Sequence, residues 1–119
     1  MAKLGLEGPW DLTDETVDEM VTETKPGNYA LGFVNDNGTF IVRYVGRSDD
    51  DLNVRLHDWT NKPRYPQFKA SYASSPKAAF EKECQNYHDF GGVEKLDNEI
   101  HPDRPEGTDW GCPVCEVFD

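Results

Sequence analysis

Two stretches of strand-like sequence flank a short polar turn near the middle of the chain. Residues 29–34 and 39–45 are rich in β-branched and aromatic side chains, which favour strands. Residues 35–38 read Asn-Asp-Asn-Gly, and Asn-Gly is a strong hairpin signal because both residues tolerate positive φ. Further along, residues 67–73 alternate apolar and polar positions. The pattern predicts an antiparallel hairpin and a third strand.

Three other segments have helical spacing of their apolar residues. Thr13 can cap the first, which ends at the Lys-Pro-Gly of residues 25–27. The second starts at Ser48 or an aspartate after it and runs to about residue 60, and the third runs from residues 74–76 to about Phe90. Their shared faces hold Val17, Met20 and Val21; Leu52, Leu56 and Trp59; and Phe80, Glu83, Cys84 and Tyr87.

The order of these elements predicts a single domain of the α/β (α+β) class. We expect a small, mostly antiparallel three-stranded sheet flanked by helices. Its core covers about residues 27–98, after an N-terminal helical extension over residues 1–26 whose first ten residues are loosely packed. The tail, residues 99–119, is too polar to be ordered unless something ties it down.

Charge is distributed unevenly along the 119 residues, whose net charge is −11. Overall this charge repels nucleic acid, but residues 43–69 carry six basic and four acidic groups and are net positive. Apolar runs long enough to span a membrane are absent, and the first ten residues lack the apolar run of a secretory signal. We therefore expect a soluble, cytoplasmic protein.

The hairpin and the helices after it carry several short motifs in a defined order. Residues 27–29 read Gly-Asn-Tyr, and residues 44–46, which close the second strand, read Tyr-Val-Gly. Arg55 lies in the following helix, Glu83 lies centrally in the last helix, and Asn98 comes after it. Over about residues 27–98 the chain resembles the GIY-YIG nuclease superfamily. Its Cys-Pro-Val-Cys end is similar to small single-domain members.

This resemblance implies a divalent-metal-dependent endonuclease that hydrolyses DNA phosphodiester bonds. Glu83 would hold Mg²⁺ or Mn²⁺ together with several waters, and Arg55 would contact the phosphate. Tyr29 would orient or deprotonate the attacking water, with support from Tyr44. The resemblance implies two further substrate-binding residues, Arg47 and Asn98.

Each of these residues also has an ordinary structural interpretation. Tyr29 and Tyr44 can be strand aromatics that pack the sheet, and Arg55 can be a surface residue of an amphipathic helix. Glu83 can be a carboxylate at the rim, paired with a lysine. His57 is assigned no role.

The three cysteines favour a metal site over a disulfide framework. Cys112 and Cys115 form a half-site for zinc, and Cys84 and His88 lie at i and i+4 on one helix face. These four would make a structural zinc site that ties the tail to the helix, with His101 as the alternative ligand.

Two functions follow, from different classes. The first is the nuclease acting on DNA. The second is a catalytically inactive binding or adaptor domain of the same fold, which meets a protein partner through its acidic faces. Clustering of the basic side chains around Tyr29 and Glu83 would favour the first; these side chains are Arg43, Arg47, Arg55, Lys62, Arg64 and Lys69.

Overall fold

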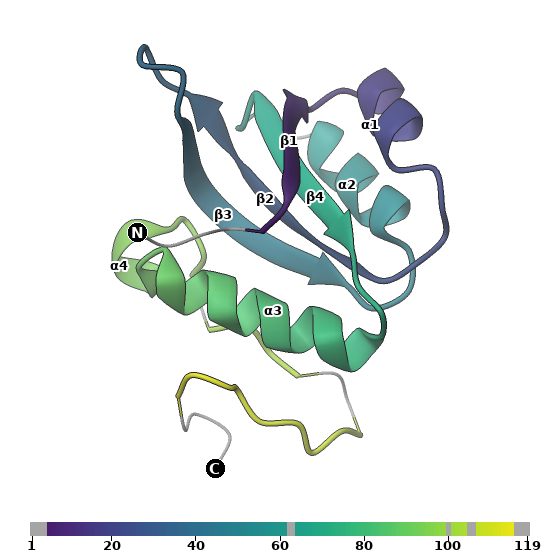
Figure 1. Cartoon of the computed structure of the whole chain (residues 1–119), viewed down its shortest axis with the longest axis vertical. Coiled ribbons are helices and arrows are strands. Elements are labelled where there is room, and N and C mark those ends of the chain that lie inside the picture. The colour runs from purple at the N-terminus through teal and green to yellow at the C-terminus, as the bar shows by residue number, and fades with distance from the viewer. Residues whose placement is uncertain (1–4, 62–63, 100, 105–106, 116–119) are drawn as a thin grey trace.

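A four-stranded antiparallel sheet forms the centre of the fold, with helices on both of its faces (Figure 1). This is a computed structural model, which describes residues 5–61, 64–99, 101–104 and 107–115. The strands are β1 (Glu7–Asp11), β2 (Gly27–Val34), β3 (Phe40–Ser48) and β4 (Gln67–Tyr72), in the order β1-β4-β2-β3. The helices are α1 (Asp14–Met20), α2 (Leu52–Thr60), α3 (Pro76–Asp89) and α4 (Gly92–Lys95).

The predicted hairpin is confirmed as β2 and β3. The side chain of Asn35 organises the turn, because its Oδ1 accepts hydrogen bonds from the backbone N–H groups of Asn37 at 2.9 Å and Thr39 at 3.0 Å. Gly38 has a φ of 81°, which a residue with a side chain rarely adopts. The turn sequence therefore sets the pairing of the two strands.

The prediction of three strands is wrong, because β1 adds a fourth. This strand lies in the segment expected to be loosely packed, and it pairs antiparallel with β4 at the sheet edge. The ring of Trp10 packs on Phe68 with centroids 5.6 Å apart. Pro9 is tolerated because an edge strand leaves one row of N–H groups unpaired. Pairing with β4 supplies order that the local sequence does not indicate.

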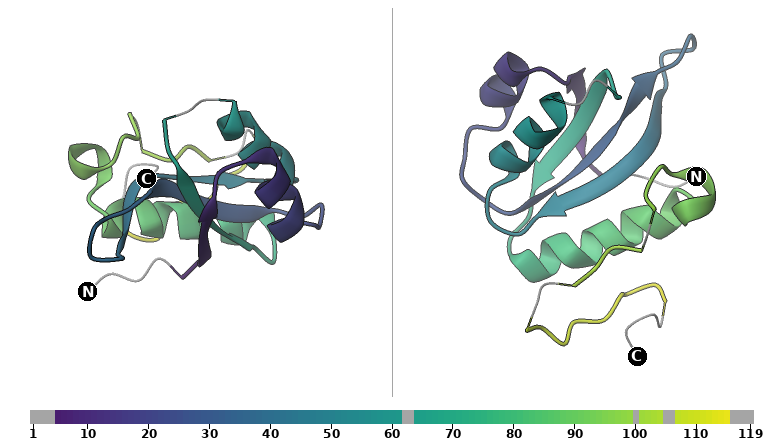
Figure 2. Two further views of the ribbon diagram at one scale, coloured as in Figure 1. Left: turned by 90° about the horizontal axis from the view of Figure 1, so that it is seen from above. Right: turned by 180° about the vertical axis from the view of Figure 1, so that it is seen from behind.

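Alternate residues of β2 face the two layers of helices. Tyr29 and Leu31 belong to the core cluster that also holds Val17 of α1 and Leu56 of α2. Ala30, between them, points to the other face of the sheet and packs in a second cluster with Tyr87 of α3 and Leu96 after α4. The sheet is thus covered by α1 and α2 on one face and by α3 on the other, as the two views of Figure 2 show.

The helix caps follow the sequence. Thr13, Asp51 and Ser75 each accept a hydrogen bond from a backbone N–H in the first turn of their helix. Helix α4 was not predicted; it starts after Gly91, whose φ of 102° ends α3 and turns the chain. Among the described residues, every helix is too short or too polar to cross a membrane.

Candidate functional site

A pocket of about 270 Å³ opens beside β3, which is an edge strand of the sheet. It lies between the C-terminal part of β3, helices α2 and α3, and the first residues of the tail. All six predicted catalytic and substrate-binding residues line it: Tyr29, Tyr44, Arg47, Arg55, Glu83 and Asn98. The other lining residues are Gly46, Asp49, His101, Pro102 and Asp103. Residues far apart in the sequence therefore meet at one place.

Glu83 is the buried acid of this pocket. Only 8% of the residue is exposed, and its Oε1 accepts a hydrogen bond of 2.6 Å from Nη1 of Arg47. Arg47 also donates through Nε to Asp49, at 2.8 Å. Burial raises the pKa of Glu83 to about 7, although the charge of Arg47 acts against this rise. The structural interpretation of Glu83 was a carboxylate at the rim, paired with a lysine. In the structure its partner is instead an arginine, and the carboxyl group is buried.

Tyr29 is held in place by a tryptophan and by a glycine. Its hydroxyl oxygen accepts a hydrogen bond of 2.9 Å from Nε1 of Trp59. A Cβ at Gly46 would lie 2.3 Å from Cζ of Tyr29, so only glycine leaves room for this ring. Burial, followed by the neighbouring Tyr44, raises the pKa of Tyr29. The phenol is therefore neutral at neutral pH, and sequence reasoning missed that Trp59 is its partner.

Tyr44 and Arg55 connect the pocket to a second hollow. This hollow, of about 380 Å³, is lined by Tyr29, Tyr44, Arg55, Asp58, Trp59 and Asn61. Arg55 is about half exposed, with Nη1 3.9 Å from Oδ2 of Asp58. The rings of Tyr44 and Trp59 lie against each other with centroids 4.7 Å apart. The two hollows share Tyr29, Tyr44 and Arg55, so a ligand bound at Arg55 can reach both.

Asn98 fastens the chain after α4 to the free edge of β3. Its Oδ1 accepts a hydrogen bond of 3.1 Å from the backbone N–H of Val45, and its Nδ2 donates one of 2.9 Å to the carbonyl of Val45. The amide group thus pairs with the strand as a neighbouring backbone would. Asn98 lines the pocket, but its side-chain amide is used to attach the chain after α4 to β3.

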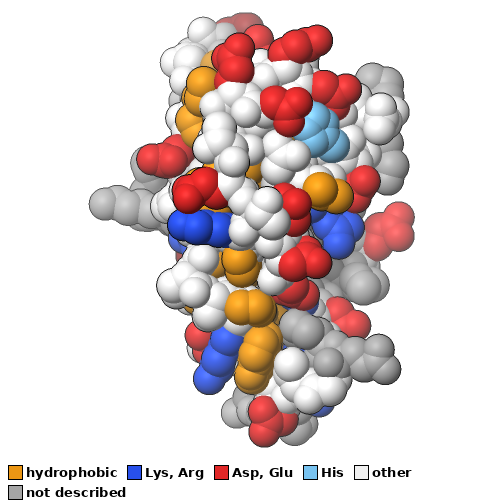
Figure 3. Space-filling view, turned by 90° about the vertical axis from the view of Figure 1, so that its right-hand side faces the viewer, with side chains coloured by type: hydrophobic (Ala, Val, Ile, Leu, Met, Phe, Trp, Pro, Cys, Tyr) orange, Lys and Arg blue, Asp and Glu red, His pale blue; other side chains and the backbone are white. Residues whose placement is uncertain are grey.

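The basic side chains do not gather into one group. Of those that the structure describes, Arg47 and Arg55 line the pocket, whereas Arg43 and Arg64 both approach Asp97. Lys69 lies over the ring of Phe40, and Lys62 is outside the described residues. On the face shown in Figure 3, acidic side chains are spread from top to bottom, and Lys and Arg form separate small patches. Positive charge at the pocket is therefore local.

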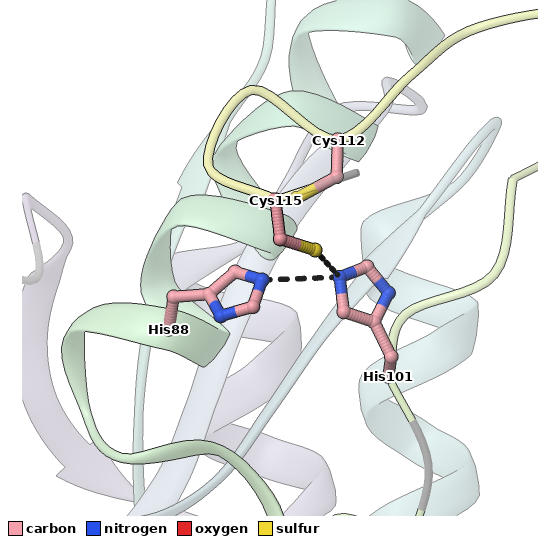
Figure 4. Close-up of side chains that lie close together, drawn as sticks. All are labelled: His88, His101, Cys112 and Cys115. Atoms are coloured by element: carbon pink, nitrogen blue, oxygen red, sulfur yellow. Dashed lines mark hydrogen bonds between the residues drawn. The ribbon is translucent and has the colours of Figure 1, made fainter. Parts of the chain in front are cut away.

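A second cluster joins the end of α3 to the tail. It consists of His88, His101, Cys112 and Cys115, whose ligand atoms all lie within 4.8 Å of one another. Figure 4 shows the four side chains pointing toward a common centre. Nε2 of His101 is 3.1 Å from Nε2 of His88 and 3.5 Å from Sγ of Cys115. This arrangement, the His/Cys group, can hold a metal ion such as zinc.

The His/Cys group differs from the predicted ligand set at one position. Cys84 was predicted to be a ligand and lies outside the four residues, whereas His101, the predicted alternative for the fourth place, lies among them. Cys84 is fully buried beside Cys112. Burial, followed by the charge and hydrogen bond of Cys112, raises the pKa of the Cys84 thiol. At Cys112, burial acts to raise the pKa, but hydrogen bonds with the backbone of Val114 and Cys115 and with the side chains of His101 and Cys115 together lower it to about 6.

His57, which the sequence left without a role, joins α1 to α2. Its Nδ1 is 2.6 Å from Oδ1 of Asp14 and its Nε2 is 2.8 Å from Oδ1 of Asp18. Hydrogen bonding to Asp18, partly opposed by burial and supported by Asp14, raises the pKa of His57. The sequence gives no sign of this contact, because it depends on how the two helices pack.

Comparisons with models of protein families, with curated proteins and with solved structures find no match. Function must therefore be inferred from the pocket and the His/Cys group themselves.

Proposed function

We propose that this chain is a divalent-metal-dependent endonuclease of the GIY-YIG type, which hydrolyses phosphodiester bonds of DNA. The observation that supports it most is convergence: six residues expected from the motifs between residues 29 and 98 line one pocket. Two arginines, a buried carboxyl group and two phenols can together neutralise charge on a phosphate, hold a metal ion and orient a water, which are the needs of phosphodiester hydrolysis.

The pocket suits one phosphate of a DNA strand. Arg55 is exposed enough to reach a phosphate from solvent, and its planar fork can bind two phosphate oxygens. Arg47 lies deeper, beside Glu83. The adjoining hollow offers the rings of Tyr44 and Trp59, on which an unpaired base can stack. This favours structured or damaged DNA ends, where a base is free to leave the duplex.

The residues of the pocket fit a hard divalent cation such as Mg²⁺ or Mn²⁺. Glu83 supplies the buried carboxylate, and Mg²⁺ is commonly held by one or two carboxylates, with water and substrate phosphate in the other positions. When bound, the ion would neutralise charge on the phosphate and assist the leaving oxygen. Arg47 supports this role, because its charge favours the ionised form of Glu83 against the effect of burial.

Tyr29 acts in this proposal by orienting water rather than by removing its proton. A buried phenol with a raised pKa is a weak base at neutral pH. Its oxygen is fixed by the hydrogen bond from Trp59, which leaves the phenolic O–H able to donate to a water or phosphate oxygen in the pocket. Arg55 would stabilise the charge that develops on the phosphate.

A second candidate is a binding domain of the same fold that has no catalytic activity. It is favoured by the scatter of the described basic side chains, which do not gather around Tyr29 and Glu83. It is also favoured by the ion pairs of Arg47 with Glu83 and Asp49, because they engage the buried acid of the pocket. The acidic face in Figure 3 would then meet a basic protein partner.

The test is cleavage of branched, nicked and flapped DNA with Mg²⁺ or Mn²⁺ over a range of salt concentrations. Glu83→Gln and Arg55→Ala are each expected to lower the cleavage rate by about 100-fold or more, because each removes a group that acts on the phosphate. Arg64→Ala is the matched control, since this arginine is 62% exposed and does not line the pocket. It is expected to change the rate less than about threefold.

Two results would contradict the nuclease proposal. Folded wild-type protein that cuts none of these substrates at any salt concentration would favour the binding domain. Cleavage that persists in both Glu83→Gln and Arg55→Ala would mean that another site or a contaminant is responsible.

For the His/Cys group we propose zinc as the ion, in a structural role. Mixed thiolate and imidazole ligands favour zinc over Mg²⁺ or Mn²⁺, which prefer oxygen. The pocket and the His/Cys group would thus hold different metals.

A further inference from the structure

His101 belongs to both sites of the molecule. It is one of the four members of the His/Cys group, and it also lines the pocket together with Pro102 and Asp103, which follow it in the chain. An ion bound by His101 would therefore act on the wall of the pocket as well as on the tail.

The distances within the His/Cys group are near those of a tetrahedral zinc site. Zinc bonds of about 2.0–2.3 Å place neighbouring nitrogen and sulfur ligands roughly 3.3–3.8 Å apart. The two Nε2 atoms are 3.1 Å apart, slightly less than this range, and Nε2 of His101 is 3.5 Å from Sγ of Cys115; all four ligand atoms lie within 4.8 Å of one another. The four side chains are thus already close to the positions that they would take around an ion.

The tautomer of His101 points to the same conclusion. Its Nδ1 is 2.7 Å from the carbonyl oxygen of Pro102, and a carbonyl can only accept, so Nδ1 carries the proton. In the neutral ring, Nε2 then presents its lone pair toward His88 and Cys115. A histidine that binds a metal commonly donates its other N–H to a carbonyl in this way.

The cysteine pair has the matching arrangement. The backbone N–H of Val114 donates to Sγ of Cys112 at 3.4 Å, which stabilises negative charge on the sulfur. Two thiolates and two neutral imidazoles make a complete set of four, which leaves no open position for a substrate.

Outside the His/Cys group, further contacts attach the described part of the tail to the body of the protein. Among described residues 96–115 there is neither helix nor strand. Asn98 is fixed to β3, and the ring of Trp110 lies 6.2 Å from that of Phe80. Residues 101–103 line the pocket, and His101 links them to α3 through His88 and through the ring of Tyr87, whose centroid is 5.2 Å away.

We propose that a zinc ion bound by His88, His101, Cys112 and Cys115 fastens the tail to α3 and thereby holds residues 101–103 in place as one wall of the pocket. Binding of zinc by these four residues does not depend on nuclease activity. A role of residues 101–103 in DNA cleavage, in contrast, rests on the proposed function.

The first experiment measures metal content and the cobalt spectrum of the full chain purified with zinc. We expect about one zinc per chain, and replacement by Co²⁺ should give the intense visible absorption of a tetrahedral thiolate site. Cys112→Ser and His101→Asn should each abolish stoichiometric binding. Cys84→Ser is the matched control, because this cysteine lies beside Cys112 but outside the His/Cys group, and it should retain the ion.

The second experiment measures amide hydrogen exchange in residues 99–104, a readout that does not depend on nuclease activity. Peptides covering residues 99–104 should exchange about tenfold faster or more in His101→Asn and in chelator-treated wild type than in the zinc-loaded chain. Peptides from β2 and the body of α3 should be unchanged, because the hydrophobic core holds them.

Several outcomes would overturn the proposal. Wild type without stoichiometric zinc would exclude the ion, and loss of zinc in Cys84→Ser with retention in His101→Asn would replace the ligand set by one of three cysteines and His88. Unchanged hydrogen exchange over residues 99–104 after zinc removal would show that zinc does not hold residues 101–103 in place. Absence of cleavage in a zinc-loaded chain with a protected wall would instead contradict only the nuclease.

Discussion

The pocket and the His/Cys group differ in what holds their side chains together. The pocket is built by β2, β3, α2 and α3, and its residues are continuous with the hydrophobic core, as the burial of Tyr29 and Glu83 indicates. The His/Cys group joins the end of α3 to a tail that has no regular structure in its described part. The side of the pocket that the core builds should therefore persist without metal, whereas the His/Cys group and the wall formed by residues 101–103 depend on the ion.

This difference suggests that the two sites have different roles. A site that the core builds can hold charged groups in a buried position, such as the ion pair of Arg47 and Glu83. A site that an ion builds can fix a polar segment that lacks a core of its own. The predictions below test this difference by changing residues of the pocket and, for comparison, residues outside both sites.

The largest expected effect on stability comes from Arg47→Ala. The side chains of Arg47 and Glu83 are only 12% and 10% exposed, so the substitution leaves a buried carboxyl group without its closest positive partner. We expect the free energy of unfolding to fall by about 3 kcal/mol, measured by urea denaturation.

The double variant Arg47→Met with Glu83→Gln should recover part of this loss, because both charges are then removed. Arg64→Ala, at an exposed ion pair, should change stability by less than about 0.5 kcal/mol. A loss below about 1 kcal/mol in Arg47→Ala would contradict the view that this pair is a buried, coupled unit.

A smaller effect is expected from Gly46→Ala. The new Cβ would lie 2.3 Å from Cζ and 2.4 Å from the hydroxyl oxygen of Tyr29, so the ring must move and its hydrogen bond with Trp59 must break. We expect a loss of about 1–3 kcal/mol together with a change in tryptophan fluorescence.

Gly38→Ala separates backbone strain from crowding in the pocket. Gly38 has a positive φ, but open space surrounds the position of its Cβ. This variant should cost about 1 kcal/mol and leave the fluorescence unchanged. Equal fluorescence in Gly46→Ala and wild type would show that Tyr29 is not confined as described.

The smallest effect is expected from His57→Gln, which changes neither site. Because the folded pKa of His57 is raised above 6.5, its protonated form stabilises the contact of α1 with α2. This contribution is complete below about pH 6.5 and is lost as the pH rises through the folded pKa. The melting temperature of the variant should therefore be lower than that of wild type by about a degree or two near pH 6, and equal to it near pH 9. A difference that grew with pH would have the wrong sign.

Local patterns in the sequence predicted much of the fold. The Asn-Gly turn, the caps at Thr13 and Ser75 and the apolar spacing of Leu52 and Leu56 each depend on neighbouring residues, and each is found. Strand β1 could not be predicted in this way, because five residues that include Gly8 and Pro9 become a strand only through pairing with β4.

The candidate sites show the same limit. Helical spacing correctly placed Cys84 and His88 one turn apart, but it could not tell that Cys84 turns into the core while the tail brings His101 to His88. Likewise, the motifs predicted which residues line the pocket, whereas the ion pair of Glu83 with Arg47 depends on how α3 packs against β3.

The central claim is that the core-built pocket holds a divalent cation at Glu83 and cuts DNA there. The most direct test compares single-turnover cleavage of a flapped duplex in Mn²⁺ by wild type and by Glu83→Gln, both folded and with equal zinc content. The account predicts a rate at least about 100-fold lower in the variant. Equal rates in the two proteins would contradict it.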